Sequence, residues 1–170
     1  MRSFLASLPI LLLTACQSGG TAPPPSSPFV QAATPEAAGH YLFLFGGCND
    51  CHTPGWAESN GHLPEAEWAL GKSVGFRGPW GTSYPENLRL AAAETGEKEW
   101  VETFRKGAGL PPMPWMNYHA VPESDLLAIQ RFLRSLGKRG VRAPAALPPG
   151  KEPATPYIDF VPKKPAATTP

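Results

Sequence analysis

The chain has few cysteines, little net charge and no apolar run long enough to cross a membrane. Only 3 of its 170 residues are cysteine, and 15 basic residues nearly balance 14 acidic ones. A near-neutral chain without a clustered basic face is not expected to bind nucleic acid. Each cysteine also belongs to one of two motifs at the N-terminal side of the chain. None is therefore left for a structural disulfide.

The N-terminus has the pattern of a bacterial lipoprotein signal. Arg2 precedes a short apolar stretch at residues 4–13, and small residues lead to Cys16. This pattern is typical of a secretory signal, and the stretch is shorter than the roughly 20 residues that span a bilayer. A Cys at the cut resembles the lipobox, which implies removal of residues 1–15 and lipidation of Cys16. The following Gln17 implies an outer-membrane lipoprotein facing the periplasm rather than an inner-membrane one. The alternative is a membrane anchor with an incidental cysteine.

The run Cys48-Asn49-Asp50-Cys51-His52 has the C-x-x-C-H spacing of a covalent haem site. Its two thiols can add to the haem vinyl groups, and the adjacent imidazole can bind the iron. The sequence contains no second such run, so one haem c per chain is expected. A redox dithiol or half of a zinc site is the alternative, but no strand precedes the pair and no second ligand pair follows it.

A second axial ligand is expected in Pro111-Pro112-Met113-Pro114-Trp115-Met116. A thioether is a soft ligand that favours ferrous iron and carries no proton. Met113 is the predicted ligand because prolines on both sides stiffen its loop. Met116 is the alternative, and both methionines could instead simply fill space against the haem. Trp115 is expected to form a wall of the haem pocket.

Low-complexity segments flank a predicted folded domain at residues 36–140. Residues 16–35 are rich in Ser, Thr, Gly, Ala and Pro and predict a disordered tether behind the lipidated Cys. Residues 141–170 predict a Pro-rich tail. That tail is interrupted by four apolar residues, which leave open whether it packs on the domain: Tyr157, Ile158, Phe160 and Val161.

Within the domain, three main helices are predicted, over residues 35–46, 97–106 and 122–136. The first is apolar nearly all round, the second has Thr95 as a possible cap, and the third begins with Pro122 in its first turn. Residues 54–94 are rich in Gly, Pro and Trp, show neither helical nor strand periodicity, and are predicted as long loops. Loops of that length need a haem to supply the missing core. The predicted fold class is therefore all-α.

Several of these motifs together resemble bacterial class I cytochromes c over roughly residues 36–140. The resemblance is carried by Gly39-His40-Tyr41-Leu42, by Gly47-Cys48-Asn49-Asp50-Cys51-His52-Thr53-Pro54, by Pro112-Met113-Pro114-Trp115, and by the helix containing Ser124-Asp125-Leu126-Leu127. It implies a small all-helical fold in which the first and last helices cross beside the haem. It also implies close contact between Gly39 and Phe132. Similar domains occur free and as subunits of periplasmic dehydrogenases.

The segment Gly75–Leu88 offers possible partners for the haem. Haem propionates need hydrogen-bond donors, and four residues of the segment carry them: Arg77, Trp80, Tyr84 and Asn87. The alternative is that these side chains only pack a loop. The free ring nitrogen of His52 also needs a partner, for which the candidates are the carbonyl groups of Pro64, Pro79 and Pro85.

These features predict an electron carrier rather than an enzyme. With His52 and Met113 on the iron, no position is open to a substrate. The expected partners are a redox donor and an acceptor protein, which dock briefly through a small interface. One alternative is a cytochrome subunit fixed within a periplasmic dehydrogenase complex. Another is a haem enzyme or gas sensor in which Met113 is displaceable.

Overall fold

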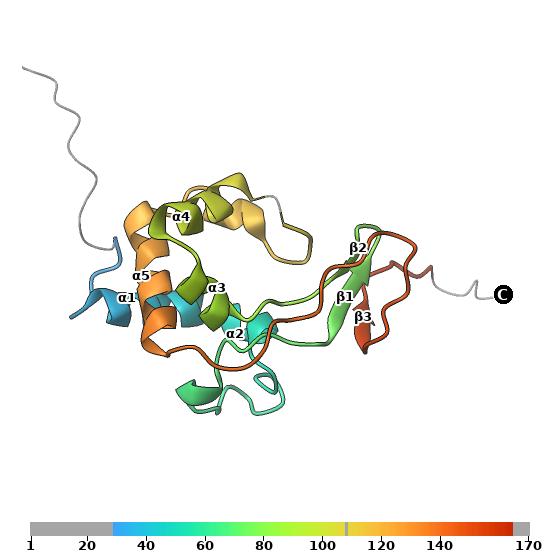
Figure 1. Cartoon of the computed structure of the whole chain (residues 1–170), viewed down its shortest axis with the longest axis horizontal. Coiled ribbons are helices and arrows are strands. Elements are labelled where there is room, and N and C mark those ends of the chain that lie inside the picture. The colour runs from blue at the N-terminus through green and yellow to red at the C-terminus, as the bar shows by residue number, and fades with distance from the viewer. Residues whose placement is uncertain (1–28, 108, 165–170) are drawn as a thin grey trace, which may run out of the picture.

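Helices form one end of the molecule and a small sheet forms the other (Figure 1). The computed structural model describes residues 29–107 and 109–164, so the predicted signal peptide and Cys16 lie outside the described residues. The helices are α1 (Pro35–Phe45), α2 (Cys48–His52), the 3-10 helix η1 (Glu65–Glu67), α3 (Leu88–Glu94), α4 (Glu97–Lys106), the 3-10 helix η2 (Trp115–Tyr118) and α5 (Glu123–Ser135). The strands are β1 (Gly75–Gly78), β2 (Gly81–Ser83) and β3 (Tyr157–Asp159).

The crossing of α1 and α5 is the main helix contact. A β-carbon at Gly39 would lie 2.0 Å from the carbonyl oxygen of Ala128 and 2.9 Å from Cβ of Phe132. Only a glycine therefore lets the two helix backbones approach this closely. This confirms the predicted contact between Gly39 and Phe132.

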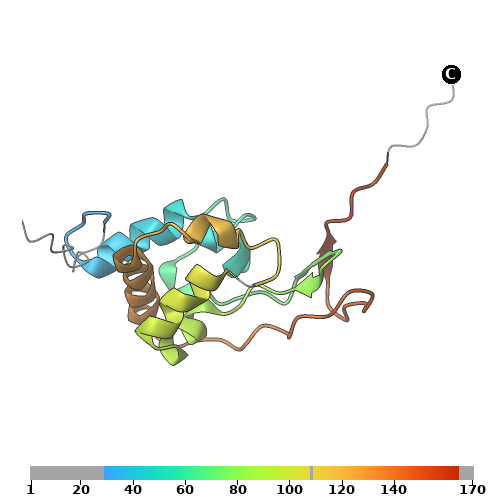
Figure 2. The same ribbon diagram turned by 90° about the horizontal axis from the view of Figure 1, so that it is seen from above.

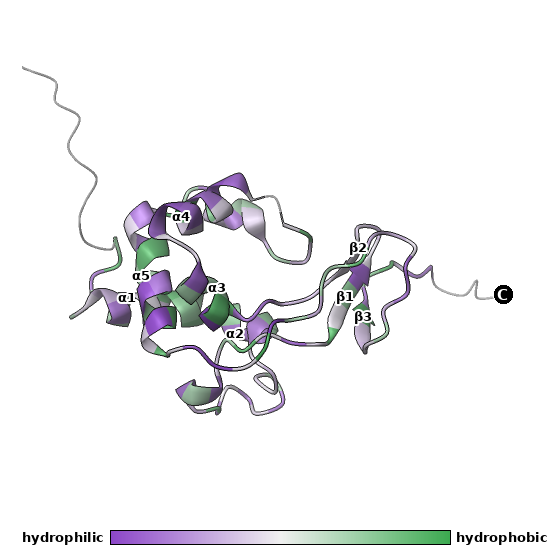
Figure 3. Cartoon of the chain, in the orientation of Figure 1, coloured by the Kyte–Doolittle hydropathy of each residue, from purple (hydrophilic) through white to green (hydrophobic). Residues whose placement is uncertain are grey.

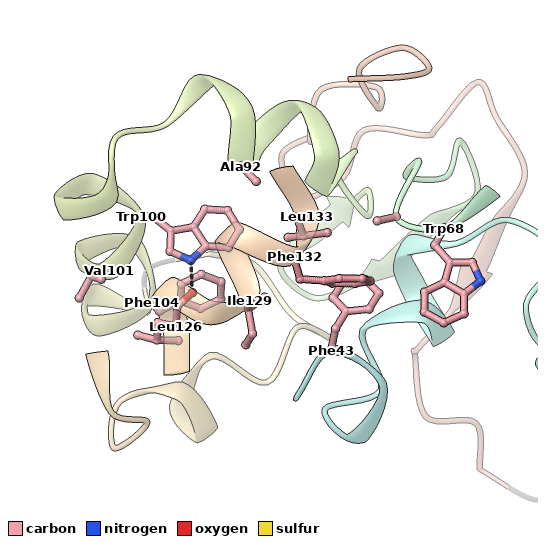
Figure 4. Close-up of a cluster of buried hydrophobic side chains, with 11 residues drawn as sticks. Phe43, Trp68, Ala92, Trp100, Val101, Phe104, Leu126, Ile129, Phe132 and Leu133 are labelled. Atoms are coloured by element: carbon pink, nitrogen blue, oxygen red, sulfur yellow. Dashed lines mark hydrogen bonds between the residues drawn. The ribbon is translucent and has the colours of Figure 1, made fainter. Parts of the chain in front are cut away.

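Apolar faces of α1, α4 and α5 form one core. Figure 4 shows Phe43 of α1 beside Phe132 of α5, and their ring centroids are 5.5 Å apart. The indole N–H of Trp100 on α4 donates a 2.9 Å hydrogen bond to the carbonyl of Leu126, so this large side chain is buried without an unpaired polar group. Hydrophilic residues of α4 appear as purple bands in Figure 3, whereas α5 also buries the polar side chains of Asp125 and Gln130. Burying each large apolar side chain of this core contributes roughly 1.5–3 kcal/mol to stability.

Short helices that the sequence did not indicate complete the helical end. α2 and α3 are much shorter than the roughly 12–15 residues that an isolated helix needs, so tertiary contacts must hold them. For α3, the side-chain oxygen of Asn87 accepts the backbone N–H groups of Arg89 and Leu90 at 3.1 Å each. The buried Arg89 guanidinium donates to the carbonyl groups of Ala66 and Gly137, which ties α3 to the end of α5.

The predicted long helices are confirmed within one or two residues at their ends. One cap was wrong, because Gly96 rather than Thr95 precedes α4. The segment before α1 is also held in place. The backbone N–H groups of Phe29 and Val30 donate to the carboxylate of Asp125 on α5, so this end of the predicted tether contacts the domain.

The all-α prediction is wrong, because three segments pair into a mixed sheet of order β2-β1-β3. β1 and β2 form an antiparallel hairpin, and β3 pairs parallel to β1 with Phe76 opposite Ile158. The strands have three or four residues and carry Gly at three of their ends, so no alternation marks them in the sequence. The pairing of β3 with β1 joins segments about 80 residues apart, which local patterns do not report.

The Pro-rich tail packs on the hairpin, and Figures 1 and 2 show it returning along the sheet. Leu147 and Thr82 exchange two backbone hydrogen bonds of 2.9 Å each, and the backbone N–H of Phe160 donates to the carbonyl of Arg77 at 2.8 Å. The apolar interruptions of the tail therefore mark its contact with the domain. Across residues 29–107 and 109–164, no helix has the length and apolarity needed to cross a bilayer.

The close helix crossing gives a direct test of the fold. Gly39→Ala should lower the free energy of unfolding by about 1–3 kcal/mol, because the new methyl group meets the α5 backbone, which cannot rotate away. Urea denaturation measures the change. The control is Gly96→Ala, where a β-carbon would meet nothing within 4 Å and the cost should stay below about 1 kcal/mol. Equal stability of Gly39→Ala and the unmodified protein would contradict the crossing.

Candidate functional site

A cavity of about 780 Å³ lies between the helices and the hairpin. This volume falls within the roughly 300–1,000 Å³ of cofactor and ligand sites. Much of its wall is apolar, formed by Phe43, Trp100, Phe104, Ile129 and Leu133. The same cavity is lined by Cys48, Cys51, His52 and Met113, so residues more than 60 positions apart in the chain meet there.

α2 presents both cysteines and His52 to the cavity. It begins after Gly47, whose left-handed backbone (φ 65°) lets the chain turn sharply out of α1. One helical turn then places Cys48, Cys51 and His52 along the same wall. The backbone N–H of Gly71 donates a 2.8 Å hydrogen bond to the carbonyl of His52, which fixes the end of the helix.

His52 is held in the tautomer that suits a metal ligand. Its Nδ1 lies 2.8 Å from the carbonyl oxygen of Glu86, and because a carbonyl can only accept, Nδ1 carries the proton and donates. Nε2 therefore keeps its lone pair. Burial lowers the pKa of His52 from its ordinary value, so the ring is neutral at pH 7. The partner carbonyl belongs to Glu86, the residue after Pro85, rather than to one of the three prolines expected from the sequence.

The two thiols differ in their surroundings. Both are free. Burial raises the pKa of Cys48 to about 11, although a hydrogen bond with the hydroxyl of Tyr118 acts in the opposite direction. Burial also raises the pKa of Cys51, and there the nearby Lys72 opposes the shift. Tyr118 was not singled out from the sequence, which contains no spacing signal that pairs it with Cys48.

The structure separates the two candidate methionine ligands. Met113 is partly buried and lines the cavity, whereas Met116 is 70 % exposed and is not among the lining residues. The difference follows from η2, which begins at Trp115 and carries Met116 away from the cavity. Trp115 also lines the cavity, and its indole N–H donates to the carbonyl of Leu110 at 3.4 Å.

Of the four donors proposed for the propionates, only Tyr84 lines the cavity. Arg77 points instead to the tail, where it forms a 2.6 Å ion pair with Glu152 and a 3.0 Å hydrogen bond to Tyr157. Trp80 packs near Phe160, with ring centroids 6.0 Å apart. Asn87 is used to cap α3 and to bind backbone carbonyls of residues 139 and 141. These three side chains contact other parts of the protein rather than the cavity.

The cavity also includes residues that sequence patterns did not single out. Phe76 and Ser83 come from the hairpin, and Ala146 comes from the tail. The apolar interruptions of the tail were the one available signal that this segment contacts the domain. Within the described residues, no three His, Cys, Asp or Glu side chains gather closely enough to hold a metal ion by themselves.

Comparison of the chain with protein families, with curated proteins and with solved structures found no match. The function is therefore argued from the cavity and its lining.

The different surroundings of the thiols predict an order of modification in the haem-free protein. Cys51 should react with iodoacetamide before Cys48, because a thiol with a pKa of about 11 is only roughly 0.1 % thiolate at pH 8. Peptide mass spectrometry after brief labelling measures both sites. The two rates should become similar once the protein is unfolded in urea. Faster labelling of Cys48 in the folded protein would contradict the arrangement.

Proposed function

We propose that this chain is a c-type cytochrome that carries single electrons through one haem bound covalently at Cys48 and Cys51. The observation that carries the proposal is the shared cavity: two free thiols, the neutral imidazole of His52 and the thioether of Met113 all line it. These are the groups that a covalently attached, six-coordinate haem requires. The cavity volume and its aromatic walls suit a large, flat, apolar cofactor.

Each lining residue has a defined task in this proposal. A bound haem would supply the one-electron chemistry. His52 would bind the iron through Nε2, while its Nδ1–H stays on the Glu86 carbonyl and fixes the orientation of the ring. Met113 would provide a second, uncharged ligand that exchanges no proton with solvent. Phe43, Trp100 and the other apolar walls would keep water away from the site.

An electron carrier is favoured over a haem enzyme by the loop around Met113. The residues next to Met113 in the chain that line the cavity are Leu110, Pro112, Pro114 and Trp115, and none of these four carries an acid or base for catalysis. We propose that Met113 keeps the iron closed to substrates. We further propose that lipidated Cys16 tethers the protein at the periplasmic face of the outer membrane, where it exchanges electrons with other redox proteins.

A fixed subunit of a periplasmic dehydrogenase complex is the second candidate. It is favoured by aromatic side chains on the outer face of α1, where Tyr41 is 52 % and Phe45 is 78 % exposed. Their rings stack at 5.8 Å. Exposed apolar groups are more typical of lasting interfaces than of brief encounters. Purification from the native membrane together with a dehydrogenase would favour this candidate.

The ligand assignment is tested by two matched methionine variants. Met113→Ala should abolish the ferric methionine–iron charge-transfer band and lower the reduction potential, because it removes the soft ligand. Met116→Ala should leave both unchanged, because that side chain lies outside the cavity. Visible spectroscopy and a redox titration measure the two effects. Loss of the band in Met116→Ala with its retention in Met113→Ala would reverse the assignment.

A further inference from the structure

The β1–β2 hairpin is bonded to the loop that carries Met113. The hydroxyl of Ser83, at the end of β2, donates a hydrogen bond to the backbone carbonyl of Pro111. Pro111 lies two residues before Met113. Ser83, Met113 and Pro112, which lies between Pro111 and Met113 in the chain, all line the cavity. The hairpin therefore holds the Met113 loop at the cavity wall.

The hairpin is in turn held by the C-terminal tail. We call residues 141–161 the C-terminal strap. Its Leu147 exchanges two backbone hydrogen bonds with Thr82, and the hydroxyl groups of Thr155 and Tyr84 lie 2.9 Å apart. These contacts are on the residues either side of Ser83. The strap thus bonds the backbone of Thr82 and the side chain of Tyr84, the two residues that flank the hydroxyl group that binds the Met113 loop.

Further contacts anchor the strap along β1. β3 pairs with β1 over three residues, and Gly75 donates its backbone N–H to the carbonyl of Pro156 at 2.9 Å. The ring of Phe160 packs on Phe76 and Trp80, with centroids 5.7 and 6.0 Å apart. Ala146 of the strap also lines the cavity. The hairpin extends well away from the helices (Figures 1 and 2), so its position depends on these contacts.

We propose that the C-terminal strap holds the Met113 loop closed over the cavity, with Ser83 as the positioning residue between them. The inference rests on the proposed haem site but assigns a task to residues outside it. When the strap is in place, the hairpin presents Ser83 to Pro111 and the loop stays shut. When the strap is lost, the loop opens more often, and Met113 competes less well with small ligands for the iron.

The direct test is ligand competition in the haem-loaded, full-length protein carrying Ser83→Ala. Loss of one hydrogen bond that closes the loop should raise the apparent affinity of the ferric protein for imidazole about fivefold, because apparent affinity follows the fraction of open loop. Ser83→Thr keeps a hydroxyl group and should restore most of the native affinity. The control is Ser73→Ala, on an exposed loop residue before β1, which should leave the affinity unchanged.

The strap itself is tested by truncation. Ending the chain after residue 144 removes Leu147, Thr155 and β3, and should raise imidazole affinity at least as much as Ser83→Ala does. Ending it after residue 164 leaves every strap contact in place and should have no effect. If the shorter protein does not fold, Thr155→Val replaces it, because it removes the hydroxyl bonded to Tyr84 from a strap residue outside the cavity lining, and it should raise the affinity in the same direction.

The possible outcomes separate this inference from the proposed function. Absence of covalent haem in the unmodified protein overturns the proposed function. The strap inference alone is overturned if the imidazole affinity is unchanged in Ser83→Ala and in the variant that tests the strap, while haem content and the methionine band are those of the unmodified protein. A purely stabilising role of the strap is recognised by a lower unfolding midpoint without a change in imidazole affinity, and that result also overturns it.

Discussion

The close approach of α1 to α5 at Gly39 fixes where the two halves of the site lie. α1 leads through Gly47 directly into α2, which carries both cysteines and His52. The loop that ends before α5 carries Met113. Because the backbone of α5 lies against Gly39, the segments attached to the two helices are brought to one cavity. A wider helix crossing would move these segments apart and separate the side chains that meet in the cavity.

Once the crossing is fixed, local bonding decides what the site can bind. Burial lowers the pKa of His52 and favours the neutral ring, while the Glu86 carbonyl holds the proton on Nδ1, so Nε2 keeps its lone pair for a metal. Burial raises the pKa of Cys48 to about 11, so its thiol is protonated at neutral pH. The walls are aromatic and aliphatic, so an apolar cofactor gains from entering while water does not. An unfilled apolar cavity would weaken the core of a small protein. A large apolar cofactor that fills the cavity would therefore complete the core and stabilise the fold.

The helical end was predictable because its signals are local. The three long helices have apolar faces or caps that can be read over ten or so residues, and the Cys-x-x-Cys-His spacing placed the thiols and His52 on one turn. The sheet was missed because β3 lies in a Pro-rich tail and pairs with β1 about 80 residues away. Arg77 and Trp80 were assigned to the haem for their donors alone. In the structure both side chains contact the tail instead, Arg77 at Glu152 and Trp80 at Phe160, and no local sequence pattern indicates these long-range contacts.

The central claim is that one haem is joined to both cysteines of the Cys-x-x-Cys-His motif. Intact-mass and peptide-mass measurement of the protein purified from its native compartment tests this most directly. The account predicts a mass increase of one haem per chain, carried by the peptide that contains Cys48 and Cys51, with neither thiol free to alkylate after unfolding. A protein with no added haem and two alkylatable thiols at these positions would contradict it.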